Sequence, residues 1–150
     1  MPIAVEIVTQ EKVIFNEPAA DMVLVPGSEG EMGILPHHAP VLTTLANGEL
    51  IVRKGRAEES FVVYGGVVDV RPDRVTVLAD LAENSYDIDV ATVEAAKASA
   101  EKLMEQGVPA EQNREAALEL RRAELALRIQ RKVAARSQVL RIIEQDDDKE

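Results

Sequence analysis

Cysteine and tryptophan are absent from the 150 residues, and the chain has only two histidines, two tyrosines and two phenylalanines. Without cysteine, the protein can have no disulfide scaffold, no thiolate zinc site and no thiol nucleophile. The N-terminal residues lack the basic start and unbroken apolar run of a signal peptide, and no segment has about eighteen consecutive apolar residues. We therefore expect a chain without a membrane anchor of its own.

Negative charge dominates the chain. Its net charge of −10 argues against general nucleic-acid binding, because phosphate contacts need a basic surface. The charge is unevenly distributed, since residues 121–141 contain seven basic side chains and a single acidic one, Glu124. A basic segment in an acidic protein is expected either to fold back onto its own acidic body or to bind an acidic protein partner.

Residues 3–82 have the pattern of a series of short strands. They are rich in Val, Ile, Thr and Leu, and several stretches alternate apolar and polar residues. Gly, Pro, Asn or Asp interrupts them about every eight to twelve residues. No helical pattern lies between them, which predicts an antiparallel β-sandwich or barrel.

The pattern becomes helical after the strands. Asp87 or Asp89 can serve as a helix N-cap, an alanine-rich run follows, and Gly107 is a stop signal. A second segment begins at Pro109 and contains no further glycine or proline, so it predicts a helix to about Gln145. The fold class is α+β by content. The predicted domains are a sandwich in residues 1–85, an antiparallel two-helix hairpin in residues 86–145 and a frayed charged tail in residues 146–150.

The facing stripes predicted for the two helices are mostly alanine. A buried alanine methyl contributes under about 1 kcal/mol, whereas a buried leucine contributes about 1.5–3 kcal/mol. The hairpin is therefore expected to be held weakly and to be able to move. The predicted contact residues are Ala91, Ala95, Ala98 and Leu103 on the first helix and Ala116, Leu120, Ala123 and Leu127 on the second.

Three glycines in the stretch GSEGEMGILPHHAPVLTTL, residues 27–45, are spaced like those of a nucleotide-binding loop. Gly27, Gly30 and Gly33 are not followed by a Lys-Ser or Lys-Thr pair, and no helix follows to direct its N-terminal amides at a phosphate. Turn and bulge glycines are therefore the better interpretation.

The same stretch contains both histidines. His37 and His38 are adjacent, so on extended backbone their side chains would point to opposite faces, and no third ligand is spaced with them. We expect neither a metal site nor a catalytic residue, because a histidine between prolines is more typical of a fixed turn or an interface. The carboxylate pair Glu58 and Glu59 is interpreted as part of a solvated turn.

The stretch VPGSEGEMGILPHHAPVLTTLANGEL resembles the signature of the epsilon subunit of bacterial and chloroplast F-type ATP synthases. Further segments of the same resemblance are IAVEIVTQEKVIF at the start, FVVYGGVVDVRPDRVTVLAD in the centre, AENSYDIDV at the junction and RRAELALRI in the second helix. This ordered set covers nearly the whole chain. It implies a ten-stranded antiparallel β-sandwich followed by a helical hairpin, in agreement with the residue patterns.

The resemblance implies a non-catalytic subunit of the central stalk, which turns with the rotor and couples proton flow to ATP synthesis. Its implied partners are the gamma subunit, the c ring and the alpha/beta catalytic head, with no nucleic acid. Its implied place is the cytoplasmic face of the cell membrane, which it touches only through the complex. The implied c-ring contact is Ser28, Glu29, Gly30, Glu31 and Met32, and the implied gamma contact is His38, Ala39 and Pro40.

In this family the hairpin can lie folded beside the sandwich or extend into the catalytic head, where it obstructs ATP hydrolysis. A helix with the net positive charge of residues 121–141 would be attracted to the acidic segment that catalytic beta subunits present there. The residues expected to contribute are Arg121, Arg122, Arg128, Arg131, Lys132 and Arg136.

Some members of the family bind ATP on the folded hairpin. Glu83, Ile88 and Asp89 match their pattern, but Thr92 and Ser99 occupy the places of two arginines. Loss of guanidinium groups removes the side chains best suited to hold a polyphosphate. We therefore expect no cofactor and no ATP sensing.

Two alternatives remain open at this point. A free-standing β-sandwich binding module, whose basic hairpin recruits an acidic protein partner, would purify without the other chains of an ATPase. A metal-dependent enzyme built on His37 and His38 would carry a stoichiometric bound metal.

Overall fold

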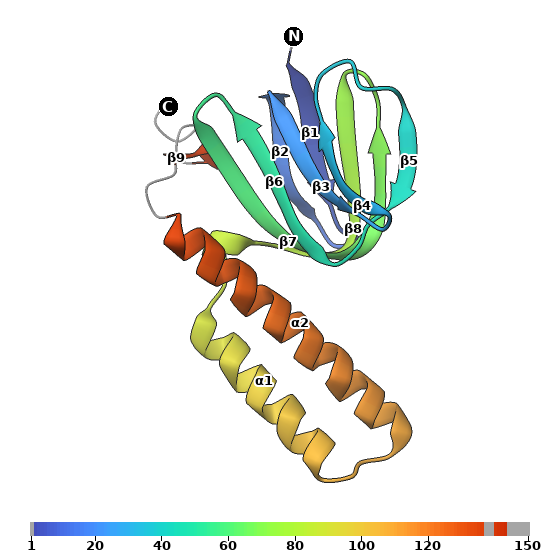
Figure 1. Ribbon diagram of the computed structural model, residues 1–150, viewed down its shortest axis with the longest axis vertical. Coiled ribbons are helices and arrows are strands. Elements are labelled where there is room, and N and C mark those ends of the chain that lie inside the picture. The colour runs from blue at the N-terminus through green and yellow to red at the C-terminus, as the bar shows by residue number, and fades with distance from the viewer. Residues whose placement is uncertain (1, 137–139, 144–150) are drawn as a thin grey trace. The chain divides into compact units, whose positions relative to one another are not determined.

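The computed structural model describes residues 2–136 and 140–143 (Figure 1). They form a β unit of residues 2–84, 136 and 140–143, and a helical unit of residues 85–135. The chain thus leaves the β unit after Asn84 and re-enters it at Arg136. The predicted frayed tail lies outside the described residues.

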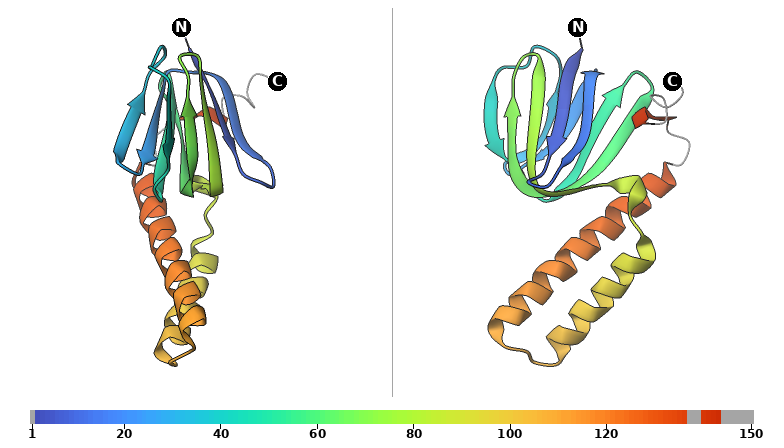
Figure 2. Two further views of the ribbon diagram at one scale, coloured as in Figure 1. Left: turned by 90° about the vertical axis from the view of Figure 1, so that its right-hand side faces the viewer. Right: turned by 180° about the vertical axis from the view of Figure 1, so that it is seen from behind.

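Nine strands are described in the β unit. They are β1 (Ile3–Val8), β2 (Val13–Ala20), β3 (Met22–Gly27), β4 (Gly30–Ile34), β5 (Val41–Thr44), β6 (Gly48–Lys54), β7 (Ala57–Val70), β8 (Arg74–Asn84) and β9 (Leu140–Arg141). The hydrogen-bonded order is β2-β1-β8-β7-β6-β3-β4, and β5 and β9 both pair with β7. Figure 2 shows the sheet folded into the two layers of a sandwich, which confirms the predicted class.

The sandwich differs from the expectation in two respects. The described residues form nine strands rather than ten, and two pairings, β1 with β8 and β7 with β9, are parallel rather than antiparallel. The second of these pairings involves β9, which lies in the segment that the sequence predicted to be the end of the second helix. The β unit therefore takes one of its strands from beyond the hairpin.

β7 is the longest strand and changes partner along its length. Residues 57–63 pair with β6, and residues 67–70 pair with β5. Between these halves, Gly65 and Gly66 have positive φ angles of 70° and 123°, which glycine adopts at little cost. The resulting bend allows one strand to hydrogen-bond with both β6 and β5.

The core of the sandwich follows from the alternation that the sequence shows. Ile3, Val5 and Ile7 alternate along β1 and are fully buried. The rings of Phe15 and Phe61 pack in the same cluster with their centroids 5.0 Å apart. Ile142 is also a fully buried member of this cluster, although it lies beyond the helices in sequence.

Glu59 is fully buried, so its interpretation as part of a solvated turn is wrong. β7 begins at Ala57, which places Glu59 inside a strand rather than in the preceding turn. Its carboxylate accepts hydrogen bonds from Asn84 Nδ2 at 3.0 Å and from Arg141 Nε and Nη2 at 3.1 and 2.7 Å. The burial of this carboxylate is thus matched by a cation and by additional donors.

The helical unit contains a 3₁₀ turn (Ser85–Asp87), α1 (Val90–Glu105) and α2 (Ala110–Ala135). Asp89 is the N-cap of α1, and Gly107, with φ of 67°, follows its end, as predicted. α2 ends at Ala135 rather than near Gln145, because Arg136 and the described residues after it belong to the β unit. The hairpin is therefore shorter than the predicted residues 86–145.

Figure 2 shows α1 and α2 side by side as a hairpin. Of the predicted stripe of α2, Ala116, Ala123 and Leu127 are buried, and Leu120 is partly buried. The predicted stripe of α1 is wrong, because Ala91, Ala95, Ala98 and Leu103 are all exposed. The less exposed face of α1 carries Val93, Lys97, Ala100 and Met104. Val93 and Met104 have more apolar surface than alanine, so burying this face is more favourable.

Asp89→Ala should weaken α1 at neutral pH. The hydrogen bond from the Thr92 hydroxyl to Asp89, followed by the bond from the Thr92 backbone N–H, lowers the pKa of Asp89 below its ordinary value of 3.8. A lowered folded-state pKa gives stabilisation that is present above the unfolded-state pKa and is lost as the pH falls through the folded-state pKa. As the pH is lowered through the folded-state pKa of Asp89, we expect the helical circular-dichroism signal to fall less in the variant than in wild type. Asp87→Ala is the control, and identical acid titrations of wild type and Asp89→Ala would contradict the assignment.

Candidate functional site

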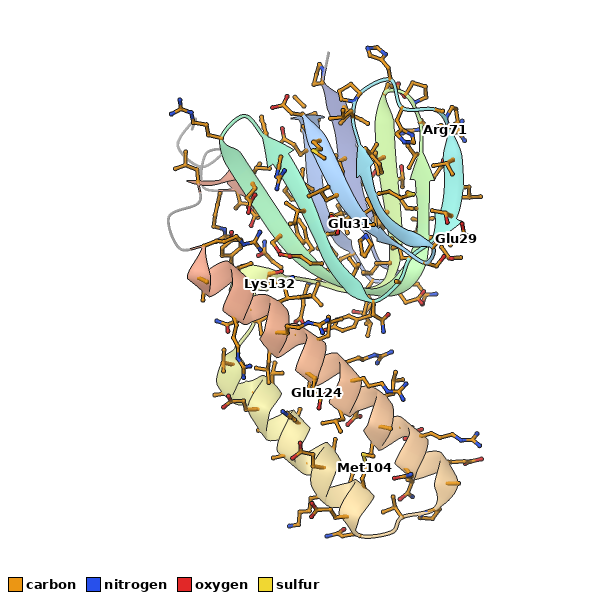
Figure 3. The ribbon with its side chains drawn as sticks, viewed as in Figure 1. Glu29, Glu31, Arg71, Met104, Glu124 and Lys132 are labelled. Atoms are coloured by element: carbon orange, nitrogen blue, oxygen red, sulfur yellow. The ribbon has the colours of Figure 1, made fainter. Side chains whose placement is uncertain are left out.

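The first surface of interest is the tip of the β3–β4 hairpin. Gly27 pairs with Gly30, which leaves Ser28 and Glu29 as the two turn residues. A Cβ on Gly27 would lie 2.8 Å from the Gly30 carbonyl oxygen, so the tight turn requires glycine there. Ser28, Glu29 and Glu31 are exposed. Figure 3 labels the two glutamates on this hairpin. The predicted c-ring contact is thus a projecting acidic tip.

This tip is fixed to the neighbouring strand. Ser28 donates its backbone N–H to the Thr44 carbonyl at 3.0 Å, and the two hydroxyls are 2.6 Å apart. Ala46 N–H donates to the Pro26 carbonyl at 2.8 Å. These bonds join the β3–β4 hairpin to the end of β5. The turn that carries Glu29 and Glu31 is therefore held in place by hydrogen bonds.

The histidines lie in a turn rather than on extended backbone, which corrects the expectation that they point to opposite faces. His37 has φ of 69° and donates its backbone N–H to the Pro72 carbonyl at 2.8 Å. His38 Nδ1 lies 2.7 Å from the Ala39 carbonyl, to which it donates. Within the described part of the chain, no three His, Asp or Glu side chains lie close enough together to hold a metal ion. The histidine pair therefore shapes a turn.

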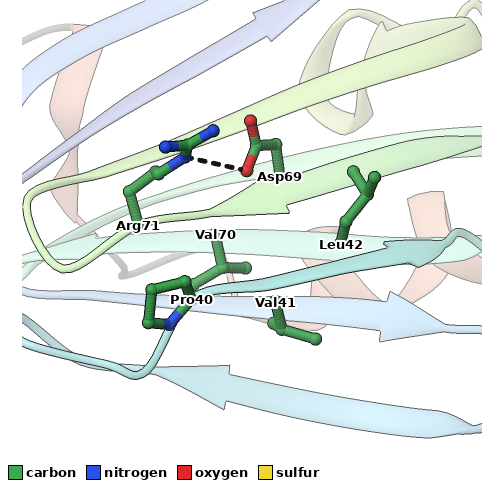
Figure 4. A pocket seen from close by; sticks show the side chains of 6 residues that line it. All are labelled: Pro40, Val41, Leu42, Asp69, Val70 and Arg71. Carbon is green, nitrogen blue, oxygen red and sulfur yellow. Dashed lines mark hydrogen bonds and ion pairs between the residues drawn. The ribbon is translucent and has the colours of Figure 1, made fainter.

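A shallow pocket lies directly after this turn, at the start of β5 (Figure 4). Its volume is about 300 Å³, and it is lined by Pro40, Val41, Leu42, Asp69, Val70 and Arg71. Leu42 is 70% exposed, and Arg71 Nε donates to Asp69 Oδ1 at 3.3 Å at the pocket edge. An apolar floor beside a charged edge suits an apolar side chain of a protein partner.

The same face of the sheet carries a row of outward-pointing apolar side chains, here called the apolar row. The strand registers pair Val67 with Leu78, Leu78 with Val8 and Val8 with Val13, so the row crosses β7, β8, β1 and β2. Leu78 and Val13 are 51% and 55% exposed. Val8 and Val67 are partly buried. An apolar surface of this kind is typical of a protein-binding site. The row depends on strand register, which the sequence alone does not provide.

The basic residues predicted for α2 divide into two groups. Arg121, Arg128, Arg131 and Lys132 are exposed on the helix, and Arg122 is partly buried. Arg136 follows the helix and lies in the β unit, where its Nη2 is 2.6 Å from Glu49 Oε2 and its Nη1 is 3.2 Å from Glu58 Oε1. Arg136 is therefore not part of the basic surface of the helix in this conformation.

The three residues that match the ATP-binding pattern have other structural roles. Glu83 accepts a hydrogen bond from the Tyr64 hydroxyl at 3.3 Å in the β unit. Ile88 is buried. Asp89 uses Oδ1 for the N–H groups of Ala91 and Thr92 and Oδ2 for the Thr92 hydroxyl. The carboxylate of Asp89 is thus engaged in capping α1.

Residues 2–85 match the family described as ATP synthase, Delta/Epsilon chain, beta-sandwich domain. The ATP synthase epsilon chain of Dehalococcoides mccartyi is 46% identical over 135 residues, which cover 89% of this chain and 96% of that relative. The epsilon chain of Herpetosiphon aurantiacus is 44% identical over 128 residues, which cover 85% of this chain and 88% of that relative. This chain belongs to the ATP synthase delta/epsilon family.

Membership of the delta/epsilon family makes the chain an accessory, non-catalytic subunit of an ATP synthase. It is therefore part of a membrane-associated complex. A solved structure of the Euglena gracilis mitochondrial ATP synthase (OSCP, F1 and c ring) contains a chain with a TM-score of 0.64. That chain is 24% identical, and the match covers 89% of this chain and 80% of the other, which shows the shared fold. Among the described helices, none is long and apolar enough to span a bilayer.

The two predicted contacts are separate in the structure. The acidic tip and the His38–Pro40 turn lie at opposite ends of β5, because Thr44 bonds to Ser28 while Val41 lines the pocket beside Pro40. Sequence reasoning missed both the exposed Leu42 beside the His38–Pro40 turn and the apolar row. In PVLTTL both Val41 and Leu42 are apolar, so the pattern does not show which of them points outward, and nothing in the sequence indicates which strands lie beside them.

Proposed function

We propose that this delta/epsilon-family chain is a rotor subunit of the central stalk in a proton-translocating ATP synthase, at the cytoplasmic face of the cell membrane. The observation that carries the proposal is the pair of separate exposed surfaces joined by β5. One is the acidic tip, and the other is the pocket with the apolar row. A subunit that connects two parts of a rotor needs two such surfaces.

The chemistry of each surface favours a different partner. Glu29 and Glu31 at the acidic tip suit a polar loop with basic residues on the c ring. The apolar row and the pocket beside Pro40 suit an apolar surface of the gamma subunit, because desolvating exposed Leu42 and Leu78 favours association.

The hairpin would act on the catalytic head. Arg121, Arg128, Arg131 and Lys132 are exposed and would bind an acidic segment of the catalytic beta subunits when the hairpin extends along gamma. In that position the helix would obstruct ATP hydrolysis. The test therefore needs a protein that keeps the sandwich and loses only the hairpin.

A hairpin-excised variant meets this need. It replaces residues 86–135 with a Gly/Ser linker of about ten residues, whose mean end-to-end distance is about 17 Å. Both ends of the linker stay anchored, since Asn84 donates to Glu59 and Arg136 donates to Glu58. We expect ATP hydrolysis by the reconstituted complex to rise several-fold while ATP synthesis is retained.

Alanine replacement of Arg121, Arg128, Arg131 and Lys132 should raise hydrolysis in the same direction with the hairpin present. Arg114→Ala is the matched control, because Arg114 is an exposed arginine of α2 outside the basic segment. Hydrolysis rates equal to wild type in both the excised and the alanine variants would refute the inhibitory role.

Leu42→Asp tests the surface formed by the pocket and the apolar row separately. We expect the chain to be lost from the complex on this substitution.

A further inference from the structure

The chain beyond α2 returns to the sandwich and is built into it. Leu140 and Arg141 form β9 and pair in parallel with Ala57 and Glu58 of β7 (Figure 1). Ile142 follows immediately and is fully buried in the core cluster. We call Arg136 and residues 140–143 together the C-terminal latch.

Ion pairs, in addition to apolar packing, hold the C-terminal latch on the sandwich. Arg136 binds Glu49 and Glu58 through separate guanidinium nitrogens at 2.6 and 3.2 Å. Arg141 binds Glu59, which is fully buried, and its Nη2 also contacts Asn84 Oδ1 at 3.5 Å. Charge-assisted bonds to buried carboxylates are stronger than bonds between neutral groups.

The backbone of the latch completes the environment of the same carboxylate. Ile143 donates its N–H to Glu59 Oε2 at 3.3 Å, while Arg141 and Asn84 donate to Oε1. Release of the latch would therefore remove a cation and a backbone donor from a carboxylate that has no solvent exposure. It would also expose Ile142. Such a segment has a well-defined docked state and a costly released state.

The latch begins where α2 ends. Arg136 directly follows Ala135, so the end of the helix stays one residue from the β unit while Arg136 is bound to Glu49 and Glu58. The hairpin is thus attached to the sandwich at both of its ends. For the C-terminal end of α2 to move away from the sandwich, the bonds of Arg136 must break.

We propose that the C-terminal latch holds the end of α2 on the sandwich and so opposes the extended conformation that blocks ATP hydrolysis. This inference rests on the inhibitory role proposed above for the hairpin. It assigns Arg136, Arg141 and Ile142 as positioning residues that control how often the inhibitory helix is released. Two opposite variants, one locked and one released, test it.

The locked variant carries Ala57→Cys and Leu140→Cys. These residues are register partners in adjacent strands, whose spacing of about 4.8 Å lies within the range of a disulfide. The chain has no cysteine of its own, so the pair can be oxidised selectively before reconstitution. Oxidation should raise ATP hydrolysis to the level of the hairpin-excised complex, and reduction should restore the wild-type rate. If the two thiols do not oxidise to a disulfide and both react freely with a maleimide, the pairing of β7 with β9 is wrong.

The released variant carries Arg136→Ala, Arg141→Ala and Glu59→Gln. The last change removes the buried charge, so loss of Arg141 does not leave an unpaired carboxylate in the core. We expect the ratio of extended to folded hairpin to rise about tenfold, with a corresponding fall in hydrolysis, because charge-assisted bonds of this type are removed. Arg56→Ala is the matched control, since Arg56 is an exposed arginine of the β6–β7 turn outside the latch.

The outcomes separate the two proposals. If excision of the hairpin raises hydrolysis but the locked and released variants match wild type, the latch proposal alone is wrong. If excision changes nothing, the inhibitory role is wrong, and the latch is then judged on the isolated protein by hydrogen exchange. Slow exchange of the Ile143 amide that becomes fast in the released variant supports the docked segment. Exchange as fast as that of a fully exposed amide in wild type overturns it.

Discussion

Arg141→Ala should lower the free energy of unfolding by about 3–5 kcal/mol, the range expected when one partner of a buried ion pair is removed. Glu59 is fully buried, and the Arg141 side chain is 20% exposed, so water does not replace the lost guanidinium effectively. The variant leaves the Glu59 carboxylate with donors from Asn84 and Ile143 but without a cation. The measurement is urea unfolding of the full chain followed by circular dichroism.

Two comparisons make the Arg141 result specific. Glu59→Gln added to Arg141→Ala should restore much of the lost stability, because a neutral amide costs less to bury than an unpaired carboxylate. Arg71→Ala removes an arginine whose side chain is 60% exposed and whose partner, Asp69, has a side chain 37% exposed, so it should cost less than about 1 kcal/mol. If the Arg141→Ala protein is as stable as the Arg71→Ala protein, the C-terminal latch is not docked on the sandwich.

Gly66→Ala should destabilise the sandwich by about 3–5 kcal/mol, from a disfavoured backbone conformation and from overpacking together. Gly66 has φ of 123°, and a Cβ there would lie 2.1 Å from the Leu78 carbonyl oxygen and 2.8 Å from the Ala79 Cα. Both atoms belong to the backbone of β8, so no side-chain rotation can relieve the contact. The Gly66 carbonyl also accepts from Leu45 N–H at 2.9 Å, and this bond would be disturbed as well.

Gly55→Ala is the control for the conformational part of this effect. Gly55 has φ of 60°, but nothing lies within 4 Å of a Cβ added there. The substitution should cost only about 1–2 kcal/mol, the usual penalty of a left-handed conformation. Urea midpoints of the two variants give the difference directly, and equal midpoints would show that β8 moves away without cost.

Local patterns predicted the parts of the fold that are determined locally. The alternation in β1 gave its buried face, Asp89 and Gly107 gave the ends of α1, and the glycines of residues 27–33 gave the hairpin turn. These features depend on neighbours a few residues apart. The acidic tip and the His38 turn could be placed for the same reason.

Contacts between distant residues could not be predicted in this way. Glu59 has the pattern of a turn residue until Arg141, 82 positions later, binds it. The end of α2 carries no glycine or proline, and the helix stops because Arg136 and Ile142 are bound by the sandwich instead. The apolar row likewise exists only once β7, β8, β1 and β2 are aligned.

β5 has a mechanical consequence for a rotating assembly. Its first residue, Val41, lines the pocket beside Pro40, and its last, Thr44, is bonded to the acidic tip through Ser28. Torque passing between partners held at these two ends would pull along the strand. Because antiparallel hydrogen bonds stand perpendicular to their strands, such a pull loads the bonds between β5 and β7 simultaneously, in shear, and does not open them one after another. A strand of four residues can thus serve as a stiff coupling.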